Sequence, residues 1–246
     1  MLLIRRFEEK VEERFRAGEL PGFLHVAIGQ EAIAVGVCKA LEDGDVIAST
    51  HRAHGHTLAK GTHPNELMAE LYGKVEGCSH GYGGSMHLYD VERGNLGANA
   101  VVGGGLPAIT GAALAFKMRG EPRVAVAYGM TSMKVDGQDV EAVYKVTKKA
   151  LEHAREGKGP VFLLCETFRL TGHYVGDPQV YRPKEEVREV RAKHDPLPKL
   201  REKLEISDDD WDELDREVTE LVEGSVEFAK NGTDPKPEDA LKNVYA

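Results

Sequence analysis

The sequence predicts an α/β fold, in which a parallel sheet is flanked by helices and followed by a C-terminal helical extension. Two observations carry this prediction. Short apolar segments alternate with amphipathic segments of helical period, as is typical of a parallel sheet covered on both faces. From residue 183 onward the pattern is charged and helical, without strand-like segments, so we divide the chain into an α/β domain (1–182) and an extension (183–246).

Helical periodicity and apolar runs place the elements of this fold. A Pro or Gly follows or opens several of the predicted helices, which supports their bounds. The predicted helices cover 2–17, 30–41, 64–72, 107–118, 140–156, 183–204 and 208–230, and the predicted strands 46–48, 124–127, 132–135 and 160–166.

Composition narrows the class of protein. The balance of 41% hydrophobic and 30% charged residues is that of a soluble globular chain. The net charge of -9 disfavours nucleic acid as a partner, and no apolar run is long enough to span a bilayer. The start lacks the features of a signal peptide. The cysteines lie far apart without a CxxC motif, so we expect reduced thiols and a cytoplasmic protein; they are Cys38, Cys78 and Cys165.

A basic cluster follows the predicted strand at 46–48. Three histidines and an arginine fall within residues 51–56, just past the end of a strand, where open α/β sheets bind their ligands. The guanidinium of Arg52 offers a fork of donors that suits a phosphate. We interpret the cluster as an anion site. The alternatives are a solvated loop or a metal site of His51, His54 and His56, although no nearby carboxylate or thiol completes it.

The segment 73–105 contains ten glycines. Its last three, Gly103 to Gly105, precede the predicted helix 107–118, so its backbone could cradle a diphosphate. Tight packing of that small-residue helix is the simpler explanation. The segment lacks the G-x-G-x-x-G pattern of dinucleotide sites, which makes a nicotinamide-dependent dehydrogenase the weaker alternative.

A polar loop, Phe168 to Arg182, follows the predicted strand at 160–166. It carries two arginines, two tyrosines, His173 and Asp177. Long loops with few flexible residues are usually functional, so we interpret it as a lid or a second part of the anion site. An ordinary polar connection is the alternative.

Six blocks of the chain resemble, in family order, the E1 α subunits of pyruvate, branched-chain 2-oxo acid and acetoin dehydrogenases. The resemblance extends from Met1 to about Leu221. It implies the thiamine-diphosphate-binding fold and an α2β2 assembly with E1 β subunits. The blocks are 29–32, 50–55, 83–87, 97–103, 135–139 and 172–182.

The resemblance also implies a reaction and residue roles. Arg52 binds the cofactor diphosphate, His51 lines the pocket, and Ala100 and Val102 contact the aminopyrimidine largely through backbone. His173, the residue given a catalytic role, contacts the diphosphate and orders its loop. The implied activity is thiamine-diphosphate-dependent oxidative decarboxylation of pyruvate or a related 2-oxo acid, or acetoin cleavage, with acyl transfer to a lipoyl group of E2. The E1 β subunit supplies the glutamate that activates the cofactor.

One departure from the family concerns the metal. In the family, the strand equivalent to 124–128 leads into Gly-Asp-Gly and a later Asn, which hold Mg²⁺ through oxygen ligands. Here Gly129 is followed by Met130 and by sequence that resembles the block after the metal motif. We therefore expect that a helix and a strand are missing at 129/130, and we assign no metal ligand. The chain as written is then predicted to bind negligible thiamine diphosphate.

Two questions stay open at this point. The chain could be a catalytically incompetent scaffold that pairs with E1 β or E2, if the gap is genuine. The substrate could be pyruvate, a branched 2-oxo acid or acetoin, and the loop at 172–177 looks closer to acetoin-type chains.

Overall fold

The computed structural model describes residues 1–127 and 133–241, and it confirms the α/β class. Five strands lie in two parallel sheets rather than one. The first has the order β2 (Asn95–Asn99), β1 (Val46–Thr50), β3 (Ala125–Ala127), and the second pairs β4 (Met133–Asp136) with β5 (Leu163–Glu166).

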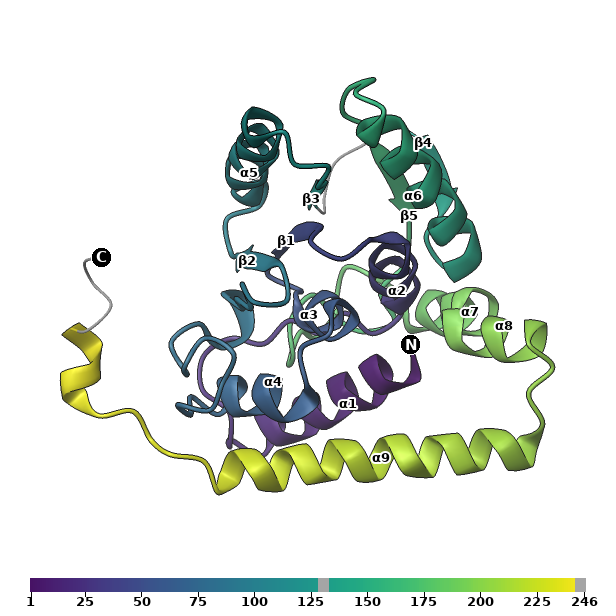
Figure 1. Cartoon of the computed structure of the whole chain (residues 1–246). Coiled ribbons are helices and arrows are strands. Elements are labelled where there is room, and N and C mark those ends of the chain that lie inside the picture. Colours follow the sequence, from purple (N-terminus) through teal and green to yellow (C-terminus); the bar gives the residue numbers. More distant parts are fainter. Residues whose placement is uncertain (128–132, 242–246) are drawn as a thin grey trace.

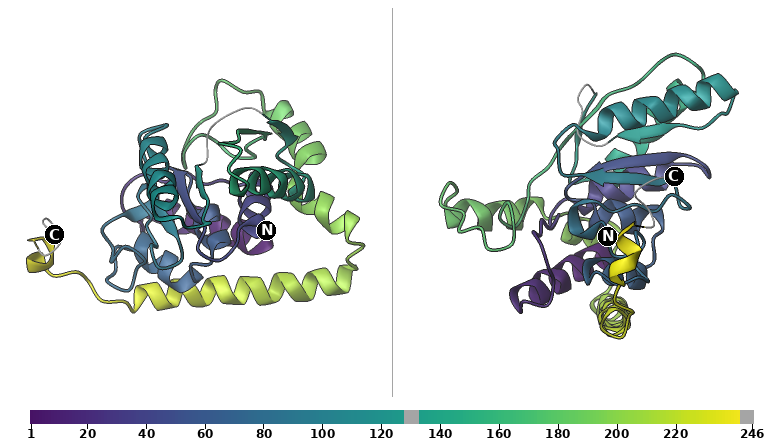
Figure 2. Two further views of the ribbon diagram at one scale, coloured as in Figure 1. Left: turned by 45° about the horizontal axis from the view of Figure 1, so that its top comes forward. Right: turned by 90° about the vertical axis from the view of Figure 1, so that its left-hand side faces the viewer.

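Helices surround both sheets (Figure 1). The long helix α9 packs along α4 and α1 on one side of the molecule, and α6 packs on α2. Figure 2 shows the same helices and sheets from two further directions. The helices are α1 (Leu2–Arg16), α2 (Glu31–Ala40), α3 (His54–Lys60), α4 (Pro64–Leu71), α5 (Gly105–Arg119), α6 (Val140–Arg155), α7 (Lys184–His194), α8 (Pro196–Lys203) and α9 (Asp208–Lys230), with short 3-10 turns η1 (Gly84–Met86) and η2 (Pro237–Leu241).

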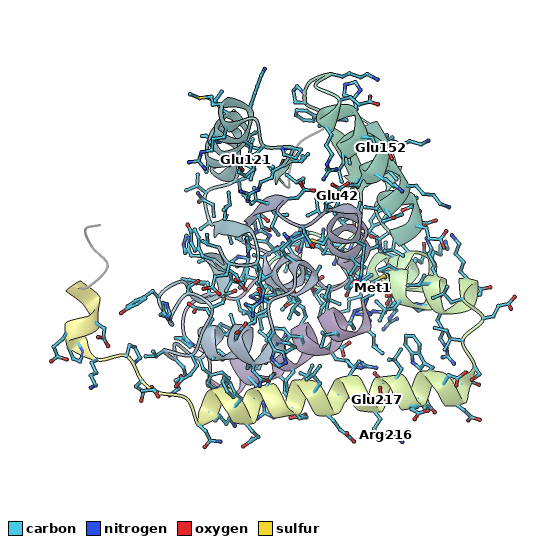
Figure 3. All side chains as sticks on the ribbon, in the orientation of Figure 1. Met1, Glu42, Glu121, Glu152, Arg216 and Glu217 are labelled. Atoms are coloured by element: carbon cyan, nitrogen blue, oxygen red, sulfur yellow. The ribbon has the colours of Figure 1, made fainter. Side chains whose placement is uncertain are left out.

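The main core forms where α1, α4 and α9 meet. Phe7 and Val11, from the predicted apolar stripe of α1, are fully buried there, together with Leu67 of α4 and Val226 of α9. Burying side chains of this size stabilises the fold by about 1.5–3 kcal/mol each. The opposite face of α9 is charged, and Figure 3 shows Arg216 projecting away from the body. None of the described helices is both long and apolar enough to cross a membrane.

Three elements differ from the predictions. The helix predicted over 183–204 is two helices, because Pro196 cannot continue a helix and disfavours helical backbone at Asp195. Asp195 instead caps α8 by accepting a hydrogen bond from the amide of Leu197 at 3.1 Å. Strand β2 and the short helix α3 were not predicted. In β2, Gly97 has a φ of +127°, and a Cβ there would lie 2.1 Å from the ring of Tyr89. The strand therefore requires a glycine, a residue that normally argues against a strand in sequence.

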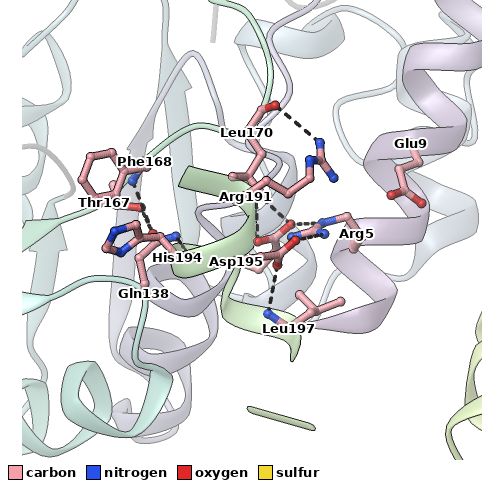
Figure 4. A network of polar contacts seen from close by, with 12 residues as sticks. Arg5, Glu9, Gln138, Thr167, Phe168, Leu170, Arg191, His194, Asp195 and Leu197 are labelled. Carbon is pink, nitrogen blue, oxygen red and sulfur yellow. Dashed lines mark hydrogen bonds and ion pairs between the residues drawn. The ribbon is translucent and has the colours of Figure 1, made fainter. Parts of the chain in front are cut away.

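A buried polar network ties the C-terminal extension to the rest of the fold (Figure 4). The guanidinium of Arg5 contacts Glu31 of α2 at 2.6 Å and both carboxylate oxygens of Asp195 at 2.9 and 3.0 Å. Gln138, 1% exposed, accepts hydrogen bonds from Thr167 and donates one to the carbonyl of His194. Helices α1, α2 and α8 and the end of β5 are thereby fixed to one another.

Candidate functional site

Three histidines from separate parts of the chain form one cluster. His25 precedes α2, His51 follows β1, and His173 lies in the loop after β5. Their ring centroids are 4.8, 5.4 and 5.9 Å apart, and one nitrogen from each ring lies within 4.8 Å of the others. The structure therefore brings together two of the predicted site residues, His51 and His173, and adds His25, which the sequence analysis missed.

Backbone pairing explains how His25 and His173 meet. The amide of Leu170 donates to the carbonyl of Ile28 at 2.9 Å, and the amide of Val175 donates to that of Leu24 at 3.0 Å. Leu24, Ile28 and Leu170 are buried. The segment before α2 and the loop after β5 are thus joined on either side of the two histidines.

Arg52 links the segment that contains Val26 to His173 through hydrogen bonds. Its side chain, 8% exposed as a residue, donates from Nη1 to the carbonyl of Val26 at 2.6 Å. Its Nη2 donates to the carbonyl of His173 at 2.5 Å and to Nδ1 of the same ring at 3.0 Å. Burial, and then the nearby charge of Arg169, lowers the pKa of Arg52 to about 10. Arg169 lines the same pocket, so two guanidinium groups approach each other there.

The electrostatics of the pocket favour an anion. Burial, and then repulsion by the neighbouring cationic groups, lowers the pKa of His25 to about 4 and also lowers the pKa values of His51 and His173. Among the described residues, Nδ1 of His25 and both ring nitrogens of His51 are buried without a hydrogen-bond partner. Buried polar atoms are normally paired, so these orphaned nitrogens indicate a ligand site. A diphosphate would neutralise the arginines and accept hydrogen bonds from the rings, and it fits this donor set.

Magnesium does not fit the residues present. Mg²⁺ requires oxygen ligands, and Glu31 is the only carboxylate that lines this cavity in the described parts of the chain. Its carboxylate already accepts hydrogen bonds from Arg5 at 2.6 Å and from the amide of Gly29 at 3.1 Å. These side chains therefore do not form a Mg²⁺ site.

The metal site considered for His51, His54 and His56 is wrong, because the three rings have separate surroundings. Fully buried His54 contacts Glu8 at 2.7 Å and the hydroxyl of Ser85 at 2.9 Å. His56 contacts the hydroxyl of Ser49 at 2.8 Å, and burial lowers the pKa of its ring to about 4. Only His51 faces His25 and His173.

The glycines before η1 serve a buried carboxylate. Glu70 of α4, fully buried, accepts hydrogen bonds from four backbone amides between 2.7 and 3.0 Å. A bend that directs four amides at one point is a site for an anion, and here the protein's own side chain fills it. This part of the glycine-rich segment therefore has a packing role. The donors are the amides of Ser79, Gly81, Gly83 and Gly84.

Ala100 and Val102 lie in the turn between β2 and α5. Neither lines the cavity that holds His51 and Arg52, and the side chain of Val102 is 80% exposed. Their predicted contact with the cofactor ring stays a prediction.

The loop over 168–182 is held in place by its own side chains. Arg182 donates to the carbonyls of Arg169 at 3.0 Å and Thr171 at 3.1 Å. Asp177 accepts hydrogen bonds from the amide of His173 and from the hydroxyl of Tyr181, both at 2.7 Å, and these donors lower the pKa of Asp177 to about 2. The loop is thus a fixed support for His173 in this structure.

The cationic pocket opens into a large cavity between the two sheets. The cavity has a volume of about 860 Å³ and is open to solvent. Strands β3 and β5 both line it. In the described residues β3 pairs with β1 alone and β5 with β4 alone, so each strand has one edge without a neighbouring strand on the cavity side.

Comparisons with known proteins agree with the resemblance. The family model described as "Dehydrogenase E1 component" matches residues 1–128 and 123–238. The acetoin:2,6-dichlorophenolindophenol oxidoreductase α subunit of Cupriavidus necator is 36% identical, with 100% of this chain and 92% of the relative covered. That of Bacillus subtilis is also 36% identical, covering 100% and 91%. The pyruvate dehydrogenase E1 component α subunit of Rhizobium meliloti is 34% identical, covering 97% and 85%.

The same comparisons bear on the expected gap. The alignment with the Cupriavidus necator relative spans 305 positions and this chain has 246 residues, so at least 59 positions of the relative face no residue here. The two family-model matches meet at 123–128. The junction predicted between Gly129 and Met130 lies outside the described residues. The cavity is lined by β3, which ends at Ala127, close to the predicted junction.

Proposed function

Because the chain belongs to the dehydrogenase E1 component family, we propose that it is the α subunit of a thiamine-diphosphate-dependent E1 that acts on pyruvate or acetoin. The predicted resemblance to E1 α subunits is confirmed by the family match and the full-length relatives. One observation carries the site itself: Arg52, Arg169, His51 and His173 line one cavity. His25 packs against both histidine rings, and buried nitrogens of His25 and His51 lack partners among the described residues. This is half of a diphosphate site.

The residues divide the work of holding the diphosphate. Arg169 and Arg52 supply positive charge in the lining of the cavity. The rings of His25 and His51 offer N–H donors, since their buried nitrogens have no competing partner among the described residues. When bound, thiamine diphosphate supplies the electron sink for breaking the bond beside the substrate carbonyl. The exposed turn of Ala100 and Val102 is then left to the cofactor ring and the partner subunit.

The contact with Arg52 determines which ring nitrogen of His173 carries the proton. A guanidinium can only donate hydrogen bonds, so Nδ1 of His173, 3.0 Å from Nη2 of Arg52, is the acceptor of that contact. The neutral ring must therefore carry its proton on Nε2, the nitrogen directed away from Arg52. Arg52 thereby orients His173 and fixes its tautomer, and His173 Nε2–H is available to a phosphate or substrate oxygen.

The remaining parts of the proposal lie outside this chain. Mg²⁺ binds with the diphosphate only when the internal segment is present, because Glu31, the only carboxylate that lines the cavity in the described residues, is already paired with Arg5. The partners are an E1 β subunit, in an α2β2 assembly, and the lipoyl group of E2. We further propose that residues 1–182 form the cofactor-binding domain, that 183–246 form a helical extension, and that the enzyme is cytoplasmic.

The experiment uses a chain in which the segment of the Bacillus subtilis relative is inserted at 129/130. This chain is assayed with an E1 β subunit against pyruvate, acetoin and branched 2-oxo acids, with a dye as electron acceptor. We expect thiamine-diphosphate-dependent turnover of pyruvate or acetoin, and its loss in His173→Ala. Absence of cofactor-dependent turnover with all three substrates would contradict the proposal.

A non-catalytic scaffold is the second candidate, and the lack of fitting Mg²⁺ ligands favours it. It predicts that the chain as given still pairs with E1 β. The coding DNA across Gly129 and Met130 separates the two candidates, since a continuous frame without an intervening segment supports the scaffold.

A further inference from the structure

We propose that the cavity between the two sheets is an acceptor site for one parallel β-strand with its adjoining helix, and that the internal segment of a relative can dock there as a separate polypeptide. The inference rests on the family membership behind the proposed function, but not on cofactor binding. The occupant is the internal segment of the Bacillus subtilis relative, whose alignment spans 303 positions whereas this chain has 246 residues.

The two sheets present edges of the right kind. Strand β3 (Ala125–Ala127) is parallel to β1, and β5 (Leu163–Glu166) is parallel to β4. Both β3 and β5 line the cavity, whereas β4 does not. A strand that pairs with β3 on one side and β5 on the other would give the order β2-β1-β3-new-β5-β4. It would satisfy backbone groups on two edges that otherwise invite pairing.

The chain cannot close the gap by itself. Only five residues, 128–132, separate the end of β3 from the start of β4. A connection between parallel strands of one sheet needs a dozen or more residues. This connection is therefore too short to join β3 and β4 as parallel neighbours in one sheet.

The walls specify the chemistry of the occupant. Helices α2, α5 and α6 line the cavity mainly with apolar side chains, so the incoming strand must be apolar on both faces, as buried parallel strands are. One polar group also faces no partner: the hydroxyl of Thr147, in a residue 2% exposed, is buried without a hydrogen bond in the described structure. The apolar wall residues of these helices include Ile33, Val37, Leu106, Ile109, Ala113 and Leu151.

Two cysteines provide an internal reporter. Cys165 lies on β5 and lines the cavity, whereas Cys78 lies in the main core, away from it. Burial raises the pKa of both thiols, that of Cys78 to about 12. Both thiols therefore react slowly with maleimide. Docking of a strand beside β5 will slow the labelling of Cys165 and leave that of Cys78 unchanged.

The experiment mixes the full chain with the segment of the Bacillus subtilis relative, fused to a soluble carrier, and without cofactor. Maleimide labelling of each cysteine is followed by peptide mass spectrometry. We expect the labelling rate of Cys165 to fall at least roughly tenfold, because it then requires local opening, with saturation at one segment per chain. The rate at Cys78 is expected to stay the same.

Two substitutions on α5 give matched controls. Ala113 lines the cavity, whereas Leu114, the next residue, does not line it and is 56% exposed. Ala113→Lys should abolish the protection of Cys165, and Leu114→Lys should retain it. Amide hydrogen exchange at Ala125–Ala127 should slow with the segment present and not with Ala113→Lys.

Several results would overturn the inference. They are an unchanged Cys165 rate, equal protection by a scrambled segment, and protection that depends on the concentration of the chain alone, which would make a second copy the occupant. If the separate segment aggregates, the chain with the segment inserted at 129/130 replaces it, and an unprotected Cys165 there has the same meaning. Docking without any later cofactor binding would leave this inference standing and contradict the proposed function.

Discussion

Arg52 is a site residue that could be identified from the sequence alone. The motif around Arg52 and the loop around His173 stand out in the sequence as dense groups of donors beside strand ends, and the structure brings them together. His25 is one histidine in an apolar stretch, and backbone pairing of its segment with the loop after β5 places it beside His51 and His173. A histidine four residues before the block at 29–32 is the signal that could have identified it.

Arg52→Lys tests the fork of the guanidinium. A lysine cannot contact the carbonyl of Val26, the carbonyl of His173 and its ring together, and hydrogen bonds to charged groups are worth about 1.5–3 kcal/mol. We expect thiamine diphosphate to bind roughly ten- to hundredfold more weakly. Calorimetry on the segment-restored chain with E1 β measures this. Arg188→Lys, on the exposed face of α7, is the control, and equal affinities in both variants would refute the role.

The low pKa of His25 predicts how stability depends on pH. Its ordinary pKa of 6.5 falls to about 4 in the folded state. As the pH falls below 6.5, the unfolded chain takes up a proton that the folded chain does not. The free energy of unfolding should therefore be constant above 6.5 and decrease toward pH 4. In urea titrations His25→Asn should decrease this slope, and exposed His153→Asn should not. Identical slopes in both variants would speak against a neutral His25.

At the scale of elements, apolar periodicity predicted the long helices well, because their buried stripes determine them. Strand β2 and helix α3 escaped detection, since their sequences are rich in glycine and histidine and their conformations depend on tertiary contacts. The break between α7 and α8 is caused by Pro196 and could have been predicted from it. The role of Glu70 could not, because nothing local links it to amides nine to fourteen residues later.

Glu70→Gln tests whether the carboxylate organises the segment before η1. An amide NH₂ directed at the four backbone donors leaves at least one of them unsatisfied, which costs about 1–3 kcal/mol per group. We expect the free energy of unfolding in urea to fall by about 3 kcal/mol. Exposed Glu92→Gln should change it by less than about 0.5 kcal/mol. Equal stabilities would remove Glu70 from this role.

Two neighbouring arginines allow a comparison of buried and exposed ion pairs. Arg5 pairs with Asp195, whose side chain is 8% exposed, whereas Arg6 pairs with Asp215, 30% exposed. Asp195→Asn should lower the free energy of unfolding by about 1.5–3 kcal/mol, because the buried guanidinium of Arg5 loses one of its two carboxylate partners and keeps only Glu31. Asp215→Asn should cost about 1 kcal/mol or less. Urea unfolding measures both, and a reversed order would show that α8 is not fixed through Arg5.

For the whole molecule, the sequence predicted the α/β class but not two sheets. Alternation of apolar and helical segments shows which elements form, whereas strand pairing depends on the length of the connections between them. The junction where a segment was predicted to be missing falls between β3 and β4, and the sheets to which these strands belong both border the cavity. Arg52, His51 and His173 lie together without that segment, whereas the side chains that line the cavity in the described residues offer no fitting Mg²⁺ site.

The most direct measurement is a calorimetric titration of thiamine diphosphate with Mg²⁺ onto two proteins, each with an E1 β subunit. One is the chain as given, and the other carries the relative's segment at 129/130. We predict negligible binding to the first and tight, Mg²⁺-dependent binding to the second, which His173→Ala weakens. Tight binding to the chain as given, or none to the restored chain, would contradict the account.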